Sequence, residues 1–176
     1  MIEAKIDYQP VLKALRRAAD QMANTRPLMA SMAGIMHRAV EDNFEQEGRP
    51  KWKDLQPGTK LARAKTGNWP GKILQRSGAL AASIQQDFDA THAVVGTNKV
   101  YAAIQQFGGK TRPHVIRPKT KRALSFGGIV VRQVNHPGSN IPARPFLALT
   151  LRDQREMVQA ANQFYRAALD RNTPSA

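Results

Sequence analysis

Apolar side chains recur at helical spacing near both ends of the chain. Residues 11–22, 25–44 and 151–169 each place apolar side chains three or four positions apart. This period is typical of a helix that lays one face on a core. In the last segment, the face predicted to be buried holds Met157, Val158, Ala161, Phe164, Tyr165 and Ala168. The pattern predicts two helices before residue 45 and one helix at the C-terminal end.

Between these helices the apolar period falls to two. Residues 84–88 and 93–96 alternate apolar and polar side chains on either side of a turn, as in a two-stranded hairpin. Short apolar runs at 123–126 and 129–134 flank a Gly-Gly pair at 127–128, which favours a tight hairpin turn. The sequence therefore predicts an α+β fold, with an antiparallel sheet packed against N-terminal and C-terminal helices.

A chain of 176 residues suits one domain with extensions. Residues 1–170 are expected to form a single α+β domain, and residues 171–176 a frayed tail. Two basic segments are expected to project from this domain. Residues 49–76 form a loop, and residues 108–122 form an extended arm or hairpin that orders on assembly.

Positive charge is concentrated in the middle of the chain. The net charge is +14, yet residues 49–152 alone hold eighteen Lys/Arg against three Asp/Glu, a net of +15 (18 − 3). No acidic residue occurs between Asp89 and Asp153. Such a field favours a phosphate backbone or an acidic protein surface as partner.

The segment Gly109-Lys110-Thr111 looks like the end of a phosphate-binding loop. That loop requires a further glycine five positions before Gly109, where this chain has Ile104. It also follows a buried strand, whereas residues 100–107 have the pattern of a short helix. The sequence therefore argues against nucleotide hydrolysis.

Other catalytic and metal-binding patterns are weak. No two of the four histidines stand four residues apart on a predicted helix, although His114 and His136 can end neighbouring strands, which leaves a two-strand site open. Asp87 and Asp89 share one side of a strand without a third carboxylate, and metal-dependent nucleases use converging carboxylates. We expect no enzymatic activity, no metal and no cofactor.

The chain has no cysteine, no apolar run of the ~20 residues that span a bilayer, and no secretory signal at its N-terminus. We therefore expect no membrane partner, and the lack of cysteine fits a cytosolic protein.

Four separated motifs appear in an order and spacing that resemble the phage virion morphogenesis family. They are FEQEGRPKWKDLQPGT (44–59), ILQRSGALAASI (73–84), VGTNKVYAAIQQFGG (95–109) and IPARPFLALT (141–150). That family includes tail-completion proteins of P2-like phages and relatives in Mu-like phages. The resemblance implies a structural virion protein at the head–tail junction or upper tail end that assembles in the host cytoplasm. It would form a ring, commonly of six subunits, and bind neighbouring neck or tail proteins. A basic nucleic-acid-binding protein acting in DNA packaging or head maturation is the alternative.

This reading identifies candidate interface residues. Trp52 and Trp69 either anchor a partner or fold back onto their own domain. Arg144, held between two prolines, is expected to make a defined hydrogen bond to a carbonyl, a neighbour's acid or DNA, with a solvent-facing side chain as the alternative. The remaining candidates, for an oligomer or partner contact, are Lys110, Arg112, Arg117, Lys119, Lys121 and Arg122. The same six, with Arg132, are the candidates for contact with passing DNA.

Overall fold

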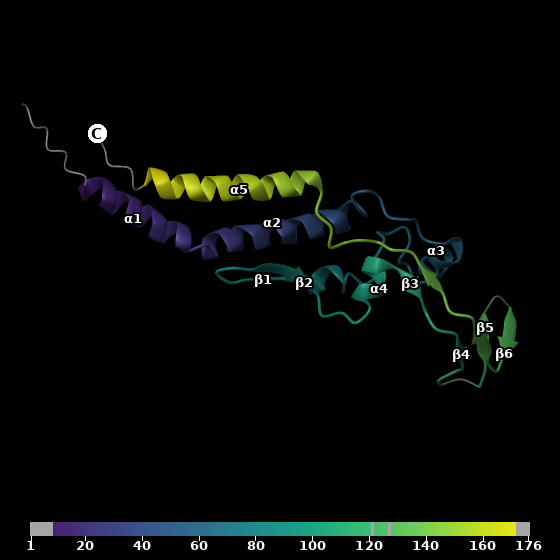
Figure 1. The fold of residues 1–176 in the computed structure, drawn as a ribbon. Helices are drawn as coiled ribbons and strands as arrows, with labels where there is room; N and C mark the ends of the chain where they lie inside the picture. Colours follow the sequence, from purple (N-terminus) through teal and green to yellow (C-terminus); the bar gives the residue numbers. More distant parts are fainter. Residues whose placement is uncertain (1–8, 121, 127, 172–176) are drawn as a thin grey trace, which may run out of the picture.

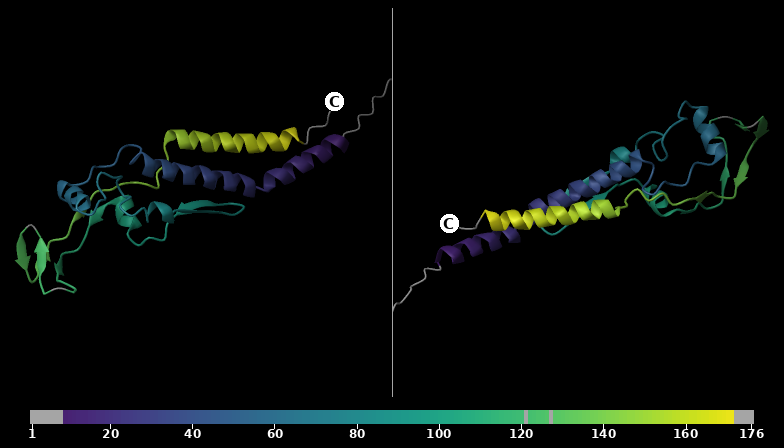
Figure 2. Two further views of the ribbon diagram at one scale, coloured as in Figure 1. Left: turned by 180° about the vertical axis from the view of Figure 1, so that it is seen from behind. Right: turned by 90° about the horizontal axis from the view of Figure 1, so that it is seen from above.

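The computed structural model describes residues 9–120, 122–126 and 128–171. The molecule is elongated, with helices at one end and small antiparallel ladders at the other (Figure 1). The two further views in Figure 2 show the same elongation. Helices and antiparallel strands both occur, which confirms the α+β prediction.

Three long helices form the helical end, as the apolar spacing predicts. They are α1 (Gln9–Ala23), α2 (Arg26–Glu45) and α5 (Leu151–Asp170). Helix α2 begins with Pro27 in its first turn, where the missing N–H costs nothing. Helix α5 begins with a capping box, in which Thr150 and Asp153 each bond the other's backbone N–H.

Helix α2 is the middle of three layers. Helix α5 packs along one side of it, and the hairpin of β1 (Gln85–Phe88) and β2 (Ala93–Gly96) packs along the other. Figure 1 shows α5 and this hairpin on opposite sides of α2. The hairpin pairs as predicted, with Gln85 opposite Gly96 and Phe88 opposite Ala93.

The core lies where α2 ends. Phe44 packs against Phe146 with the rings tilted by 34° and their centroids 5.4 Å apart, and it meets Trp52 edge-on at 5.9 Å. The chain turns sharply after α2 at Gly48, which has φ +97°. A Cβ at this position would lie 2.5 Å from the Trp52 ring, so glycine is required there.

The remaining elements are short. They are α3 (Pro57–Ala64), the 3₁₀ turn η1 (Ala81–Ser83), α4 (Ala102–Phe107), β3 (Gly109–Lys110), β4 (His114–Ile116), β5 (Leu124–Phe126), β6 (Ile129–Val131), β7 (Val134–His136) and β8 (Asn140–Ile141). The strands form four two-stranded ladders, β1–β2, β3–β8, β4–β7 and β5–β6, where a single sheet was expected. Every described strand has two to four residues, and β4 is exposed throughout. In the described part of the chain, the ladders therefore share no apolar face that would join them into one sheet.

The basic arm is paired within its own chain. Strands β3 and β4 pair with β8 and β7, so residues 109–116 run antiparallel to residues 134–141. Phe126 is opposite Ile129, which confirms the two-residue hairpin turn, although Gly127 itself lies outside the described residues. Of the two forms expected for this segment, an extended arm or a hairpin, the structure therefore has the paired form over these residues.

The chain exposes much more surface than a compact protein of its size. Its accessible surface is 13,406 Å² for 19.5 kDa. A folded monomer of that mass exposes about 8,500 Å². The fifteen residues outside the description account for at most about 2,400 Å² if each counts as unfolded chain. Shape alone therefore leaves at least ~2,500 Å² more surface than a compact monomer has.

Candidate partner-binding interface

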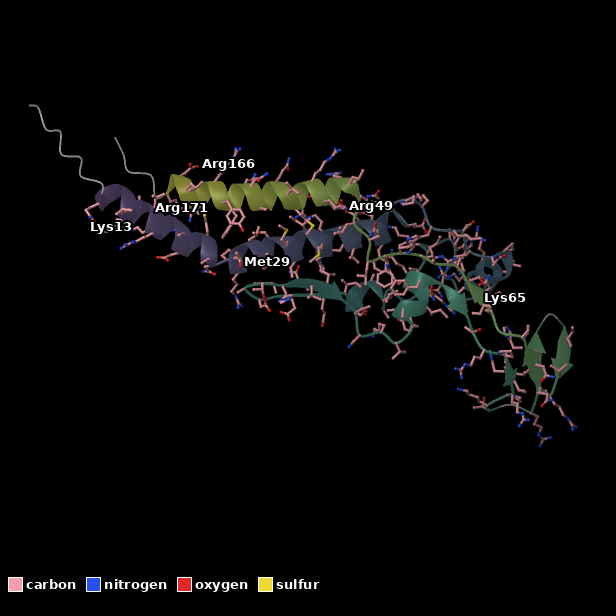
Figure 3. The ribbon with its side chains drawn as sticks, viewed as in Figure 1. Lys13, Met29, Arg49, Lys65, Arg166 and Arg171 are labelled. Carbon is pink, nitrogen blue, oxygen red and sulfur yellow. The ribbon has the colours of Figure 1, made fainter. Side chains whose placement is uncertain are left out.

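A buried polar cluster joins the helical end to the chain that leads to the ladders. The guanidinium of Arg49 donates to both carboxylate oxygens of Asp153, at 3.2 and 3.0 Å, and to the backbone oxygen of Ala39 at 2.8 Å. Its Nε donates to Oδ1 of Asn43 at 2.9 Å. The cluster ties the end of α2 to the start of α5, and Figure 3 labels Arg49 at this junction.

Asn43 extends the cluster to the IPARPFLALT segment (141–150). The side chain is 1% exposed, and its Nδ2 donates to the backbone oxygens of Phe146 and Ala148 at 2.9 and 2.8 Å. Each polar atom of this amide group is used, as buried polar groups require. The segment between the ladders and α5 is thereby fixed to α2.

Hydrogen bonding, more than burial, sets the ionisation of Asp153. Burial alone would raise the pKa of its carboxyl group. Hydrogen bonds from the backbone and hydroxyl of Thr150, and then from Arg49, outweigh burial and lower the pKa below its ordinary value. Asp153 is therefore ionised at neutral pH, opposite a permanently charged guanidinium.

Arg144 is buried and makes the defined hydrogen bond predicted for it. Its Nε donates to the backbone oxygen of Lys53 at 3.1 Å, and one Nη donates to that of Asp54 at 3.3 Å. Burial, followed by the nearby Arg63, lowers the pKa of Arg144. With 7% of the residue exposed, its assignment to an external interface is corrected: it fastens the 49–76 loop to the core.

The two tryptophans differ. Trp52 is 8% exposed, and its Nε1–H donates to the backbone oxygen of Pro145 at 3.0 Å, so it belongs to the chain's own core and not to an interface. Trp69 is half-buried, with the ammonium group of Lys60 5.1 Å from its ring centroid. The attraction between this cation and the indole face is a contact within the chain that covers part of the Trp69 ring.

The predicted cations lie together on the ladders at the end of the molecule opposite α1. Six of them are exposed: Lys110, Arg112, Arg117, Lys119, Arg122 and Arg132. We call these six residues the basic lobe. Lys121, also predicted here, lies outside the described residues. Figure 1 shows β4, β5 and β6 at the end of the molecule away from α1.

The basic lobe has no acidic partner of its own. Elsewhere in the described chain, three cations form ion pairs: Arg38 with Glu156, Arg49 with Asp153, and Lys60 with Asp54. Among the described residues, no member of the basic lobe forms an ion pair. The lobe is therefore a concentrated positive surface, suited to an external polyanion.

The two histidines that could end neighbouring strands do so. His114 is opposite His136 in the β4–β7 ladder, and their rings stack with centroids 5.1 Å apart. Nδ1 of His136 accepts a hydrogen bond from the backbone N–H of Gly138 at 3.0 Å. In the part of the chain that the structure describes, no group of three or more His, Cys, Asp or Glu is arranged to hold a metal.

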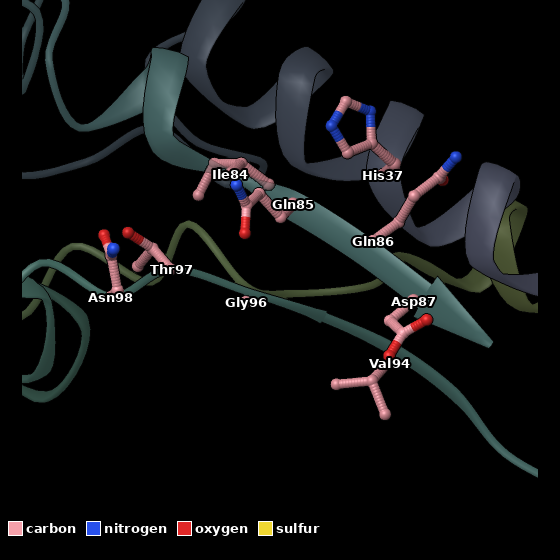
Figure 4. A pocket seen from close by; sticks show the side chains of 9 residues that line it. All are labelled: His37, Ile84, Gln85, Gln86, Asp87, Val94, Gly96, Thr97 and Asn98. Carbon is pink, nitrogen blue, oxygen red and sulfur yellow. The ribbon is translucent and has the colours of Figure 1, made fainter.

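An open groove runs along β1 beside α2. It is lined by His37, Ile84, Gln85, Gln86, Asp87, Val94, Gly96, Thr97 and Asn98 (Figure 4). Nearby, the backbone N–H groups of Thr91 and His92 lower the pKa of Asp89 to about 2. Asp89 thus caps its own turn, and the groove gathers no set of acid, base and nucleophile.

Comparison with known proteins gives this arrangement a context. The model of the phage virion morphogenesis family matches residues 6–164. The chain belongs to that family. The resemblance suggested by the four sequence motifs is therefore confirmed, and family membership supports a role in phage assembly.

Relatives within the phage virion morphogenesis family match almost end to end. The Mu-like prophage FluMu G protein 2 of Haemophilus influenzae is 36% identical over 168 residues, covering 94% of this chain and 96% of the relative. The putative capsid assembly protein G of Escherichia phage Mu is 27% identical over 165 residues, covering 90% and 92%. No solved structure matches the chain significantly. Of the described residues, no helix has both the length and the apolar character to span a membrane.

Sequence reasoning missed the cluster of Asn43, Arg49 and Asp153. A signal was present in the Thr150-to-Asp153 spacing, which is that of a helix-capping pair. Asn43 is a second signal, because it is polar beside the apolar stripe of a helix. Neither signal names the partner, since Arg49 and Asp153 are 104 positions apart.

Proposed function

We propose that this chain is a non-enzymatic structural subunit that completes the tail or the head–tail neck of a phage virion. It assembles as a ring, with six subunits as the family resemblance implies. The observation that carries the proposal is the surface excess of at least ~2,500 Å² over a compact monomer. Obligate interfaces bury 2,000–5,000 Å² or more. The excess surface of this chain is thus large enough for extensive contacts with other copies of the chain or with neighbouring virion proteins.

Exposed apolar side chains support the same proposal. Along the described chain, large apolar residues are more than half exposed on several elements, including Leu61, Val100, Phe107 and Leu151. Single exposed apolar residues are ordinary on monomers. Their number on an elongated molecule with a small core fits a subunit whose folding is completed by assembly.

The basic lobe provides the contact to the next component. It lies at the far end of the molecule from α1, so a ring built through the helical end would present the lobes together. In this arrangement the partner is an acidic face of a neighbouring neck or tail protein, and passing genomic DNA makes only loose phosphate contacts.

The unpaired cations also favour a second candidate function, binding of nucleic acid in packaging or head maturation. The two functions differ in what the isolated chain does. A packaging protein binds duplex DNA as a monomer, whereas a neck subunit needs its protein neighbours for stable attachment.

Deletion of the gene from a phage that encodes this chain tests the proposal. Electron microscopy of the lysate is expected to show DNA-filled heads beside unjoined or unfinished tails, and expression of the chain in trans should restore whole particles. The phage Mu relative is named as a putative capsid assembly protein. Malformed or empty heads with normal tails would therefore assign the chain to head assembly and overturn the proposal.

A further inference from the structure

Helix α5 has a second apolar face that its own chain does not cover. Its inner face packs on α2, while Leu151, Val158 and Tyr165 are 71%, 60% and 40% exposed. Their spacing of seven residues aligns them along one stripe of the helix. The sequence-based assignment of Val158 and Tyr165 to the buried face is therefore wrong. That assignment failed because apolar spacing marks both sides of this helix.

Positive charge borders this outer stripe. Arg152, Arg155 and Arg166 are exposed on α5, and each lies within about 100° of the stripe on a helical wheel. Figure 3 shows Arg166 on the side of α5 away from α2. Two α5 helices placed stripe to stripe would bring these arginines together, which disfavours a symmetric α5–α5 contact.

The layer on the other side of α2 has the complementary character. On the β1–β2 hairpin, strand alternation directs Phe88 toward α2, where the Arg26 guanidinium lies 5.4 Å from its ring. The same alternation directs Asp87 and Val94 outward, and Val94 is 56% exposed. Figure 4 shows the side chains of Asp87 and Val94 pointing away from α2.

Exposed apolar residues continue along this layer. Val100, between β2 and α4, is 97% exposed, and Phe107 at the end of α4 is 78% exposed. The layer also holds Asp87 and Asp89, two of the three acidic residues between positions 49 and 152. This layer therefore complements the outer stripe of α5: apolar side chains can meet apolar side chains, and acidic groups can meet arginines.

We propose that the outer stripe of α5 in one copy docks on the outer face of the β1–β2 hairpin in a second copy of this chain. The two surfaces lie on opposite sides of α2, so the contact is head-to-tail and each copy can bind two neighbours. A head-to-tail contact closes into a ring when its rotation permits. The proposal rests on the proposed function and deepens it, by assigning the surfaces through which the ring is built.

The absence of cysteine from the chain makes the contact directly testable. The double variant Val94→Cys with Val158→Cys places one thiol on each surface, on opposite sides of the middle helix. Two layer spacings of about 10 Å each separate the thiols within one chain. A flexible bis-maleimide, which tolerates more than the ~7 Å Cα–Cα limit of a disulfide, should therefore link copies and not close within one copy.

The expected result is a cross-linked ladder of dimer, trimer and larger species from the double variant, with almost none from either single variant. The matched control is Leu61→Cys with Val158→Cys. It keeps Val94 and places the first cysteine instead at Leu61 on α3, which is 65% exposed, so it should give no ladder. Circular dichroism would verify that all four proteins are folded.

Four results would overturn the proposal. Dimers from Val158→Cys alone would show a symmetric α5 contact, and equal ladders from the double variant and its control would show unspecific collision. The same holds if no variant cross-links at a concentration where light scattering finds the wild type as a multimer, or if the wild type stays monomeric at millimolar concentration. None of these outcomes decides the gene-deletion test, so the inference and the proposed function fail separately.

Discussion

The guanidinium of Arg49 and the carboxylate of Asp153 form a bidentate pair between residues that are 104 positions apart. Both side chains are largely buried, at 13% and 7% exposed. This pair closes the junction at which α2, α5 and the segment leading from the ladders meet. The relative placement of the helical end and the basic lobe therefore depends on it.

Replacement of Asp153 by Asn is expected to destabilise the chain by about 3 kcal/mol at pH 7, because the buried guanidinium of Arg49 loses its bidentate partner and keeps only the longer ion pair with the half-exposed Asp42, at 3.4 Å. The hydrogen bonds that lower the pKa of Asp153 stabilise the fold fully above its unfolded value of about 3.9. That stability is lost as the pH falls through the lower pKa that Asp153 has in the folded state. Urea unfolding at pH 7 and pH 3 should therefore show the difference from wild type shrinking in acid.

The matched control for this prediction is Asp20→Asn, which alters an exposed carboxylate on α1. Its effect should stay within about 0.5 kcal/mol. An equal loss for both variants at pH 7 would contradict a stabilising role for the pair.

Trp52 is expected to be a core residue in solution. Trp52→Ala should lower the free energy of unfolding by about 3–5 kcal/mol, because it empties the space between Phe44 and the backbone of Pro145. Trp52→Phe should cost less, since it keeps a ring and loses the Nε1–H bond. Thermal melts followed by circular dichroism measure both, with the half-buried Trp69→Phe as control. Similar melting temperatures for Trp52→Ala and Trp69→Phe would reject the assignment.

Two glycines in turns beside the ladders, Gly128 and Gly138, allow the effect of steric crowding to be measured apart from that of backbone strain. A Cβ at Gly138 would lie 2.1 Å from the backbone oxygen of Thr111, whereas a Cβ at Gly128 meets nothing within 4 Å. Both have positive φ, +87° and +81°, so both alanine variants carry strain of about 1 kcal/mol. Only Gly138→Ala should open the β3–β8 and β4–β7 ladders.

Amide hydrogen exchange would detect that opening. The Thr111 N–H donates to the backbone oxygen of Ser139 at 2.9 Å, and the Ser139 N–H donates to Oγ1 of Thr111 at 2.7 Å. Faster exchange of both amides is expected for Gly138→Ala and not for Gly128→Ala. Unchanged exchange in both variants would mean that Thr111 does not contact the turn at Gly138.

The basic lobe is expected to give weak, salt-sensitive contact with duplex DNA. Combined replacement of Arg117, Lys119 and Arg122 by Ala should weaken that binding and reduce its dependence on log salt by up to about 2.7, at ~0.9 for each phosphate contact. Fluorescence anisotropy at two salt concentrations measures this. The charge-matched control changes the exposed Lys13, Arg16 and Arg17 of α1 to Ala.

Equal losses from the two triple variants would contradict a localised basic surface. Tight DNA binding by the monomer that persists at physiological salt would instead favour the packaging candidate over the neck subunit.

The sequence predicts well those helices and strands whose apolar residues recur at a regular spacing. Helix α2 and the β1–β2 hairpin appear near their predicted positions, because apolar spacing reports which face is buried. The outer stripe of α5 shows the limit of this argument. Val158 has the same apolar character whether it faces its own core or another chain. A single sequence therefore cannot tell a core position from a subunit contact.

Polar contacts between residues far apart in the sequence cannot be predicted from the spacing of apolar residues. Arg144 is predicted to make a defined hydrogen bond, yet its acceptors on Lys53 and Asp54 lie about half the chain away. The pairing of β3 with β8 is equally hidden, because two-residue strands have no period to read. Such contacts are fixed by tertiary geometry.

The position of the chain in the assembled particle tests the central claim most directly. Cryo-electron microscopy of the virion that carries it should place copies of the chain in a closed ring at the head–tail junction or the upper end of the tail. Copies in the capsid shell, or a finished virion that contains none, would contradict the account.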